Sequence, residues 1–378
     1  MAALNRAERA MMGAAESELE QFQEMVQDEK ERVATEGTKA RKRDESAKVW
    51  AFVRKRPLMD GERTRKCFDV VTTLQSGEWG GRVVMHEPKR KVDLEKYVEN
   101  HNFDFDLVFD ESTQNSQVYA AAVAPLFERM SRNPGMHATV FAYGQTGSGK
   151  TYTISSFYLQ ACDDVFGVAR SAGATVAARF YEIYGGKCFD LLAGRKQVQP
   201  MEDAKGQVCL VGLTQRAAGS SREVASFIES GLRHRATGCT SANAQSSRSH
   251  SLLELVLVRQ SGRRGEEVVG KLALVDLAGS ERGADRGNTD IKTRQEGAEI
   301  NKSLLALKEC IRSLHQGDQQ HVPFRGSRLT HILRDAFIGK HSHTVLLAHI
   351  SPSSGSAEHS LNTLRYAVRL KESNTAGG

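Results

Sequence analysis

The sequence has 378 residues, of which 39% are hydrophobic and 26% are charged, and its formal net charge is +6. This composition is ordinary for a soluble globular protein with a large core, and the modest positive charge permits an acidic partner without identifying one. No apolar run approaches a membrane span, the polar N-terminus is not a signal peptide, and six scattered cysteines favour a reduced, cytosolic chain.

Residues 1–47 form a segment of different composition, with no proline and two glycines. Its abundance of Ala, Glu, Arg, Lys and Met favours a helix. Apolar residues recur along it every seven positions, at Met12, Leu19, Val26 and Val33. Because this stripe is too thin for a self-standing coiled coil, we expect a charged helical neck that docks on another surface. The basic cluster 39–43 at its end is either a solvated charge run or a contact for an acidic polymer.

A globular domain is expected from residue 48 to residue 373, followed by a disordered tail at 374–378. Apolar patterns predict strands at 49–54, 103–110, 138–142, 175–184, 252–259, 271–276 and 343–350. Helical periodicity predicts helices at 116–130, 150–161, 221–233, 296–314, 327–337 and 356–371. Strands interspersed with helices predict an α/β fold with helices on both faces of a sheet. Hairpin-like neighbours among the strands indicate that this sheet is mixed.

The strongest motif follows the apolar strand 138–142 and fits the pattern G-x-x-x-x-G-K-[ST]. Its residues are Gly144, Gln145, Thr146, Gly147, Ser148, Gly149, Lys150 and Thr151. Glycines let backbone N–H groups turn around phosphate oxygens, and the following helix directs its positive end at the same anion. The pattern predicts that Lys150 reaches the β- and γ-phosphates and that Thr151 ligates Mg²⁺. The alternative is a Gly-rich hairpin.

A phosphate-loop NTPase needs a second acidic anchor for its metal. Asp276 ends the apolar strand 271–276 and suits this role, although it could instead cap the next turn. Gly279 leaves its N–H free to approach a γ-phosphate, and Glu281 places a carboxylate within reach of an attacking water. Residues 243–250 gather hydroxyls, an amide and a guanidinium. They form either a loop that orders on the γ-phosphate and Mg²⁺ or a Ser-rich surface loop.

Together these segments resemble the kinesin motor domain family. Residues 141–151, 243–250 and 276–281 resemble its phosphate loop and two switch loops, and Arg54-Lys55-Arg56-Pro57 resembles its R-x-R-P adenine-binding motif. Order and spacing also fit over about residues 48–373. The resemblance implies a phosphate-loop NTPase with a mixed, mostly eight-stranded central sheet, preceded by a helical neck. It implies ATP and Mg²⁺ as cofactors.

The resemblance also implies roles for single residues. Arg54 and Pro57 would flank the adenine by guanidinium and ring contacts. The implied nucleotide-binding set also contains Arg56, Asn243, Ser246 and Ser247, and Ser247 would hold Mg²⁺ with Thr151 and Asp276. Arg248 would pair with Glu281 when ATP is bound. Glu281 would then relay the proton of the attacking water, which is catalysis by positioning and electrostatics.

Two further motifs resemble the kinesin-13 subfamily. Lys91-Val92-Asp93 is similar to the tip of its long second loop, and Lys308-Glu309-Cys310 is similar to its K-E-C motif. Kinesin-13 proteins do not walk, and they use ATP to remove tubulin from microtubule ends. The implied microtubule-binding residues are Lys91, Val92, Asp93, Lys302, Lys308, Glu309, Arg312, Arg325 and Arg328.

The helix predicted at 296–314 supports a binding surface independently of the resemblance. Apolar residues that share one face are Ile300, Leu304, Leu307, Ile311 and Leu314. Lys302 and Glu309 fall roughly opposite, so the helix presents charged groups outward, although a solvated amphipathic helix would look the same. A basic face would favour fast, salt-sensitive capture of acidic tubulin.

Some residues depart from the kinesin-13 pattern. Ser280 stands where an Asn is usual, Gly326 replaces a Glu, Gly185 replaces an Asn or Ser, and the segment 155–163 looks short. None of these changes removes a catalytic group.

The main alternative is a kinesin that translocates along microtubules, and another is a microtubule-binding module without catalysis. We expect no nucleic acid and no membrane partner. We also expect a monomeric motor domain, a full-length protein that is either monomeric or dimeric, and a cytoplasmic, cytoskeletal location that leaves spindle and flagellar roles open.

Overall fold

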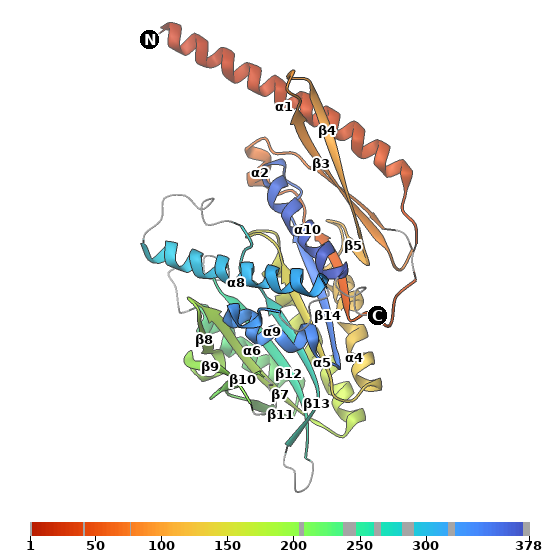
Figure 1. Cartoon of the computed structure of the whole chain (residues 1–378), viewed down its shortest axis with the longest axis vertical. Helices are drawn as coiled ribbons and strands as arrows, with labels where there is room; N and C mark the ends of the chain where they lie inside the picture. The colour runs from red at the N-terminus through yellow and green to blue at the C-terminus, as the bar shows by residue number, and fades with distance from the viewer. Residues whose placement is uncertain are drawn as a thin grey trace.

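The computed structural model describes residues 2–40, 42–75, 77–203, 208–236, 247–260, 266–281, 291–316 and 322–372. The tail predicted at 374–378 lies outside these residues. In the described part, one mixed sheet forms the centre of the molecule, in the order β10-β9-β8-β7-β12-β13-β6-β14-β1-β5, with β11 paired to β7 (Figure 1).

Eight of these strands form the part of the sheet that runs from β8 to β5. They are β1 (Val49–Lys55), β5 (Leu107–Phe109), β6 (Met136–Tyr143), β7 (Thr175–Tyr184), β8 (Lys187–Asp190), β12 (His250–Gln260), β13 (Glu266–Asp276) and β14 (Ser342–Ile350). The expected mixed sheet is confirmed, but its described part has 11 strands. The additional strands are β9 (Lys196–Glu202) and β10 (Val208–Val211), which extend the sheet beyond β8, and β11 (Arg216–Ala218), which pairs with β7.

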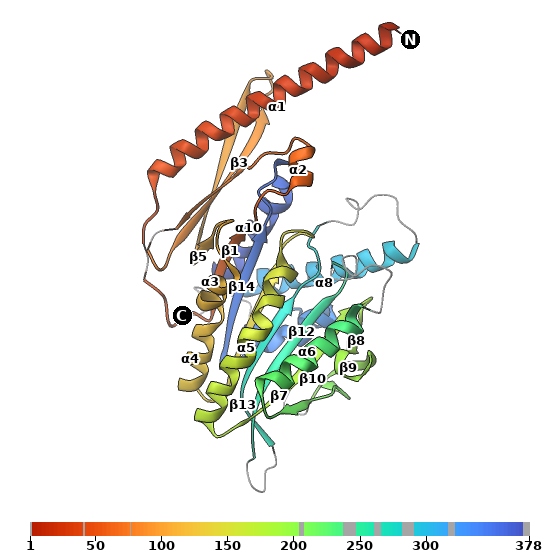
Figure 2. The same ribbon diagram turned by 180° about the vertical axis from the view of Figure 1, so that it is seen from behind.

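Helices cover both faces of the sheet. One face carries α3 (Asn115–Ala122), α4 (Ala124–Arg132), α5 (Lys150–Ala172) and α6 (Ser221–Ala236), and the other carries α8 (Ile291–His315), α9 (Arg328–Ile338) and α10 (Ala357–Glu372) (Figures 1 and 2). Strand residues alternate between the two cores: Val140 packs with α5 residues such as Phe157, whereas Phe141 packs with Leu307 of α8. The predicted apolar face of α8 is confirmed, because Ile300, Leu304, Leu307 and Ile311 are buried.

A smaller sheet stands at one end of the molecule. It consists of β2 (Val71–Gln75), β3 (Gly81–Arg90) and β4 (Lys96–Phe105), and a short helix, α2 (Asp60–Thr64), precedes it. Strands β3 and β4 form a long hairpin that projects beyond the central sheet (Figure 1). This sheet was not expected, because the charges and turn residues of 60–93 outweighed its short apolar runs, such as Val70-Val71 and Val83-Val84-Met85, in the sequence analysis.

The neck helix α1 (Ala2–Glu36) lies along this small sheet (Figures 1 and 2). Val26 is buried in the core that the sheet shares with α10, Leu19 and Phe22 pack partly against that core, and Val33 is also buried. The prediction of a docked neck is confirmed for these residues, and the docking surface belongs to the same chain. In the basic cluster that follows, the guanidinium carbon of Arg43 lies 4.1 Å from the Trp50 ring centroid, so this cation is an anchor rather than a solvated charge.

Two predicted elements are each divided in the structure. The strand expected at 103–110 becomes β4 and β5, because Asp106 turns away from β3 and exchanges hydrogen bonds with the backbone of Ala51. The helix expected at 116–130 becomes α3 and α4, because Pro125 lies in the first turn of α4, where a missing N–H is tolerated. The helix expected at 150–161 is longer in the structure. It continues through residues 155–163 as α5 and is capped at its C-terminal end by Gly173.

Among the described residues, no helix combines the length and apolar character that crossing a bilayer requires.

Candidate active site

Four parallel strands end at one edge of the central sheet and bring the predicted motifs together. Strand β6 pairs with β13 on one side and with β14 on the other, and β14 pairs with β1. Asp276 stands opposite Ala142, directly before the predicted phosphate loop, and Lys55 stands opposite Ile350. Carboxyl ends of parallel strands next to helix N-termini are the usual place for ligands in such sheets.

The loop 144–149 has the backbone shape that its glycines predict. Gly144 has φ 151°, and a Cβ there would overlap the His349 carbonyl oxygen. Gly149 has φ 98° and caps α5. Lys150 is buried, and its Nζ donates hydrogen bonds to the carbonyl oxygens of Gly144 (2.9 Å) and Gln145 (2.8 Å). The loop therefore surrounds an ammonium group, which gives it a positive centre.

Hard oxygen donors meet at the end of β13. The Thr151 hydroxyl donates to Asp276 Oδ2 at 2.8 Å, and Arg235 Nη1 lies 3.4 Å from the same oxygen. Asp276 is buried, and its Oδ1 has no hydrogen-bond partner among the described residues. An unsatisfied buried carboxylate oxygen beside a hydroxyl fits a divalent cation that prefers oxygen ligands. Sequence reasoning missed Arg235, although it lies at the end of the helix that leads into the 243–250 loop.

Backbone hydrogen bonds join the two predicted switch segments. The Gly279 N–H donates to the Ser247 carbonyl oxygen (3.2 Å), and the Ser280 N–H donates to the Gly144 carbonyl oxygen (3.1 Å). His250 Nδ1 accepts from the Ala278 N–H at 3.0 Å, and its Nε2 lies 2.9 Å from Ser303 Oγ. Burial, with nearby cations, lowers the pKa of His250 to about 3, so the ring is neutral and links both segments to α8.

Arg248 and Glu281, predicted to pair when ATP is bound, have different partners in the structure. Glu281 Oε2 accepts the Thr146 N–H at 2.8 Å, so this carboxylate lies on the phosphate loop. Arg248 Nη1 instead lies 3.3 Å from Glu296 Oε2 on α8. Sequence reasoning missed Glu296 because its partner is 48 residues away. Asn243 and Ser246 lie outside the described residues.

The R-x-R-P segment lies on the other side of the phosphate loop. Arg54 is buried and donates to Thr153 Oγ1 (2.8 Å) and to the Thr113 carbonyl oxygen (3.0 Å). Its guanidinium carbon is 5.7 Å from the ring centroid of Tyr152, which is 70% exposed. The exposed Tyr152 ring, stacked over the Arg54 cation, therefore offers a surface for a planar base. Sequence reasoning missed this residue.

Arg56 contacts the phosphate loop directly. Its Nε donates to the Gly147 carbonyl oxygen at 2.7 Å, and both terminal nitrogens bond Glu62. This bidentate hydrogen bonding lowers the pKa of Glu62 to about 2. Pro57 is exposed at the rim of the site.

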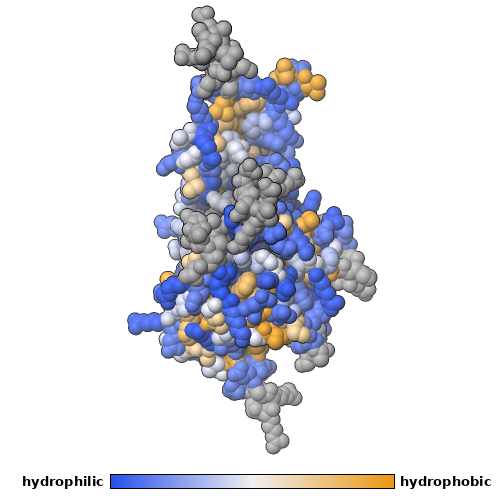
Figure 3. Space-filling model, turned by 90° about the vertical axis from the view of Figure 1, so that its left-hand side faces the viewer, coloured by the Kyte–Doolittle hydropathy of each residue, from blue (hydrophilic) through white to orange (hydrophobic). Residues whose placement is uncertain are grey.

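The predicted partner-binding residues lie on the surface, in two places. At the tip of the β3–β4 hairpin, Val92 is fully exposed, Leu94 is 70% exposed, and Lys91 Nζ pairs with Glu95 at 2.5 Å. On α8, the outward residues Lys302, Glu309 and Arg312 are exposed, and Lys308 is half-buried. Figure 3, viewed from the side where α8 begins in Figure 1, shows a largely hydrophilic face.

Of the two remaining predicted cations, Arg325 lies just before α9 and Arg328 is the first residue of α9. Arg325 pairs with Glu202 at 2.6 Å, so its charge is partly satisfied within the chain, and Arg328 is half-buried.

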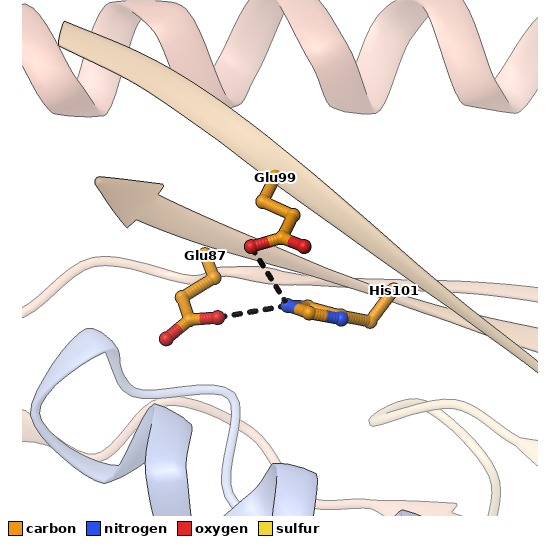
Figure 4. A group of neighbouring side chains, drawn as sticks. All are labelled: Glu87, Glu99 and His101. Carbon is orange, nitrogen blue, oxygen red and sulfur yellow. Dashed lines mark hydrogen bonds and ion pairs between the residues drawn. The ribbon is translucent and has the colours of Figure 1, made fainter. Parts of the chain in front are cut away.

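A second group of metal-ligand types lies on the hairpin shaft. Figure 4 shows His101 Nε2 between carboxylates of Glu87 (2.8 Å) and Glu99 (3.8 Å). The Lys89 ammonium pairs with both glutamates, and these bonds raise its pKa above the ordinary value. A cation of the chain itself therefore offsets one of the two carboxylate charges, and the group acts as an ion-pair network across β3 and β4.

Comparisons with known proteins agree with this geometry. A family model described as kinesin motor domain matches residues 54–373. The kinesin-like protein KIN-13B of Arabidopsis thaliana is 49% identical over 336 residues, covering 86% of this chain and 47% of the relative. KIN-13A of Oryza sativa subsp. japonica is 47% identical over 358 residues, covering 90% of this chain and 43% of the relative. The chain thus spans less than half the length of these curated relatives.

A solved structure is also similar to this chain. It is described as a KIF14 dimer in a two-heads-bound state, with AMP-PNP and in complex with a microtubule. The TM-score is 0.72 at 28% identity, covering 86% of this chain and 94% of that chain.

Proposed function

This chain belongs to the kinesin motor domain family, and from that premise we propose that it is a microtubule-stimulated ATPase that removes tubulin from microtubule ends. The observation that carries the proposal is the conjunction of an NTPase site at one sheet edge with an exposed Lys91-Val92-Asp93 tip on a long hairpin. The similarity to proteins named KIN-13 supports the depolymerising activity over translocation. The proposal implies a cytoplasmic protein of the microtubule cytoskeleton.

Residues at the strand ends would bind and orient the nucleotide. Backbone N–H groups of the loop 144–149 and Lys150 would hold the phosphates, and Tyr152 with Arg54 and Pro57 would hold the adenine. Thr151, Asp276 and the Ser247 hydroxyl fit Mg²⁺, and when bound this ion supplies positive charge to the β- and γ-phosphate oxygens.

Hydrolysis would require Arg248 and Glu281 to exchange their present partners. Arg248 must leave Glu296, and Glu281 must leave the Thr146 N–H, before the two can pair. Glu281 would then accept the proton of the attacking water, directly or through a second water. The γ-phosphate would compete with Glu281 for the Thr146 N–H, so binding of ATP itself would favour the exchange.

Coupling to the track would come from the difference between straight and curved tubulin. On a straight wall, the chain would bind through α8 without completing the exchange. At a filament end, the hairpin tip would reach the groove between tubulin dimers and favour the curved form. Only that form would let Arg248 meet Glu281. Because a ligand shifts an equilibrium only through its preference, stronger binding to curved tubulin would do the bending.

The test replaces Lys91, Val92 and Asp93 with Ala and measures shortening of stabilised microtubules with ATP. Since the tip is exposed, the fold should be intact, and we expect end shortening to fall at least about tenfold while nucleotide affinity is unchanged. The matched control replaces the exposed Glu267 and Val268, at the far end of β13, with Ala. Shortening at the parent rate by the tip variant would contradict the proposal.

A further inference from the structure

The neck helix α1 faces the rim of the predicted adenine site across a cavity of about 360 Å³. Val26 and Lys30 line this cavity from α1, and Pro57 and Glu111 line it from the motor domain. The walls of a cavity do not pack directly against each other, so a connection between α1 and the rim has to run around it. Charged side chains beside the cavity provide that connection.

Four of these side chains form a chain of ion pairs. Lys30 Nζ lies 3.0 Å from Asp69 Oδ2, and Lys55 Nζ lies 2.7 Å from the same oxygen. Lys55 Nζ also lies 3.1 Å from Glu111 Oε2. The Lys55 side chain is only 4% exposed, and a buried ammonium group needs such partners. Two ammonium groups therefore balance two carboxylates, and one of the ammonium groups comes from the neck.

The far end of this chain of ion pairs belongs to the turn that holds Arg54. Glu111 lies in that turn, in which Asp110 Oδ1 accepts from the Thr113 N–H at 3.0 Å. The Thr113 carbonyl oxygen in turn accepts from Arg54 Nη2 at 3.0 Å. Lys55 directly follows Arg54 on β1. The ion pairs therefore reach the Arg54 guanidinium through the turn and its backbone through β1.

Loss of the neck cation would unbalance these charges. Without Lys30, Asp69 and Glu111 would share the single Lys55 ammonium, and their mutual repulsion would favour release of one carboxylate. Glu111 is the more exposed of the two, at 44% against 24%, so it is the one that would turn to water. Its turn would then be less fixed, and the Arg54 guanidinium would be less well ordered.

We propose that Lys30 of the neck is a positioning residue for the adenine and that it acts on Arg54 through these ion pairs. The inference rests on the proposed contact of Arg54 with the adenine. A docked neck strengthens binding of the base, and by linkage a bound base strengthens docking of the neck by the same factor. The phosphates are held by Lys150 and the phosphate loop, so their binding does not depend on the neck.

Isothermal titration calorimetry of the nucleotide-free chain with ADP and Mg²⁺ tests the proposal. We expect Lys30→Gln to weaken ADP binding about twofold to fivefold, which is the usual scale of a partly exposed ion pair. The affinity for pyrophosphate and Mg²⁺ should stay at the parent value, because pyrophosphate has no base. The matched control is Lys66→Gln, which removes an exposed ion pair of the motor domain with Glu16 of the neck, away from the cavity. It should bind both ligands like the parent.

A second variant separates this path from a general loss of stability. Asp69→Asn removes the shared carboxylate and keeps an oxygen that can accept the Val71 N–H. It should also weaken ADP binding, and adding Lys30→Gln to it should have no further effect, because both changes act on one path. Hydrogen exchange supplies the reciprocal readout. ADP should slow exchange at residues 26–36 in the parent and much less in Lys30→Gln.

Unchanged ADP affinity in Lys30→Gln, an equal loss in Lys66→Gln, or an equal loss of pyrophosphate affinity would overturn the proposal. A parent chain that bound neither ligand would instead contradict the proposed nucleotide site. The failure of this inference and the failure of the proposed function are therefore distinguishable.

Discussion

Gly279 lies where the second switch segment passes closest to the phosphate loop. A Cβ at this position would overlap the Thr146 hydroxyl and the Glu281 carboxylate. We therefore predict that Gly279→Ala displaces Glu281 and lowers tubulin-stimulated phosphate release by about 100-fold or more, with ADP affinity changed little. Gly167→Ala is the control, because a Cβ there meets nothing within 4 Å and the position lies inside α5. If Gly279→Ala released phosphate at the parent rate, the segment around Gly279 would have to accommodate a methyl group without displacing Glu281.

The Arg248–Glu296 pair gives a second residue-scale prediction. Glu296→Gln keeps an oxygen that can accept from Tyr184 Oη but removes the charge that holds Arg248. Arg248 is 26% exposed, so the pair is partly screened and its effect is moderate. We expect tubulin-free ATP hydrolysis to rise about threefold to tenfold, because Arg248 reaches Glu281 more often.

Steady-state phosphate release without tubulin measures this effect, with Arg248→Ala as the variant that should lose hydrolysis. If Glu296→Gln lowered the basal rate instead, Glu296 would support the active arrangement.

Sequence located the residues that form local patterns but not their distant partners. The phosphate loop and Asp276 were predictable because glycine spacing and a carboxylate after a buried strand suffice to recognise them. Arg235 and Glu296 were not, since each gains its role from a residue more than 40 positions away. The contacts of Arg56 with Glu62 and Gly147 were likewise not visible in the sequence, and its predicted nucleotide contact stays a prediction.

At the scale of elements, the neck helix depends on a narrow apolar contact. Val26 is 1% exposed against the small sheet, whereas Gln27 beside it is exposed. Val26→Asp would remove the burial of the valine side chain, which contributes about 2 kcal/mol, and would place a carboxylate in the apolar contact. We predict that α1 is released while the central sheet stays folded.

Hydrogen exchange measures this release as faster exchange at residues 19–36 with unchanged protection of β6 and β14. Gln27→Asp makes the same change on the solvent face and should behave like the parent. Unchanged protection of α1 in Val26→Asp would mean that its polar contacts, such as Asn100 with Glu29, are sufficient to hold it.

Elements with strong periodicity were predictable, and those that depend on tertiary partners were not. The strand at 343–350 was recovered to within one residue, and the helix at 296–314 was recovered at its C-terminal end, although α8 begins five residues earlier, at Ile291. The hairpin was missed because β4 is half-buried along most of its length and shows no clear alternation. The strand break at Asp106 depends on its contact with Ala51, and the helix break at Val123 depends on Pro125. The apolar pattern runs on through both positions, so it does not reveal either break.

For the whole molecule, buried histidines predict a sharp loss of stability in acid. Burial lowers the pKa of His137 to about 4 and those of His250, His343 and His349 to about 3. As pH falls below about 6.5, the unfolded chain binds these protons first. The neutral rings therefore contribute fully to the free energy of unfolding above pH 6.5. Each ring loses about 1.4 kcal/mol of this contribution per pH unit as the pH falls toward 3 to 4.

Urea unfolding between pH 7.5 and pH 5 measures this loss as a falling free energy of unfolding. His343→Phe keeps an aromatic ring against Trp50, 4.2 Å away, and should flatten the slope by about one histidine's share. A free energy of unfolding that did not change over this range would show that the rings bind protons as readily in the folded chain as in the unfolded chain.

The central claim is that this chain couples ATP hydrolysis to the bending of tubulin at filament ends. It is tested most directly by recording the lengths of stabilised microtubules with time in the presence of purified chain and ATP. The account predicts that the filaments shorten steadily from their ends when ATP is present, and that their lengths stay constant in the control without ATP. Filaments that keep their full length while gliding in one direction over the immobilised chain would contradict it.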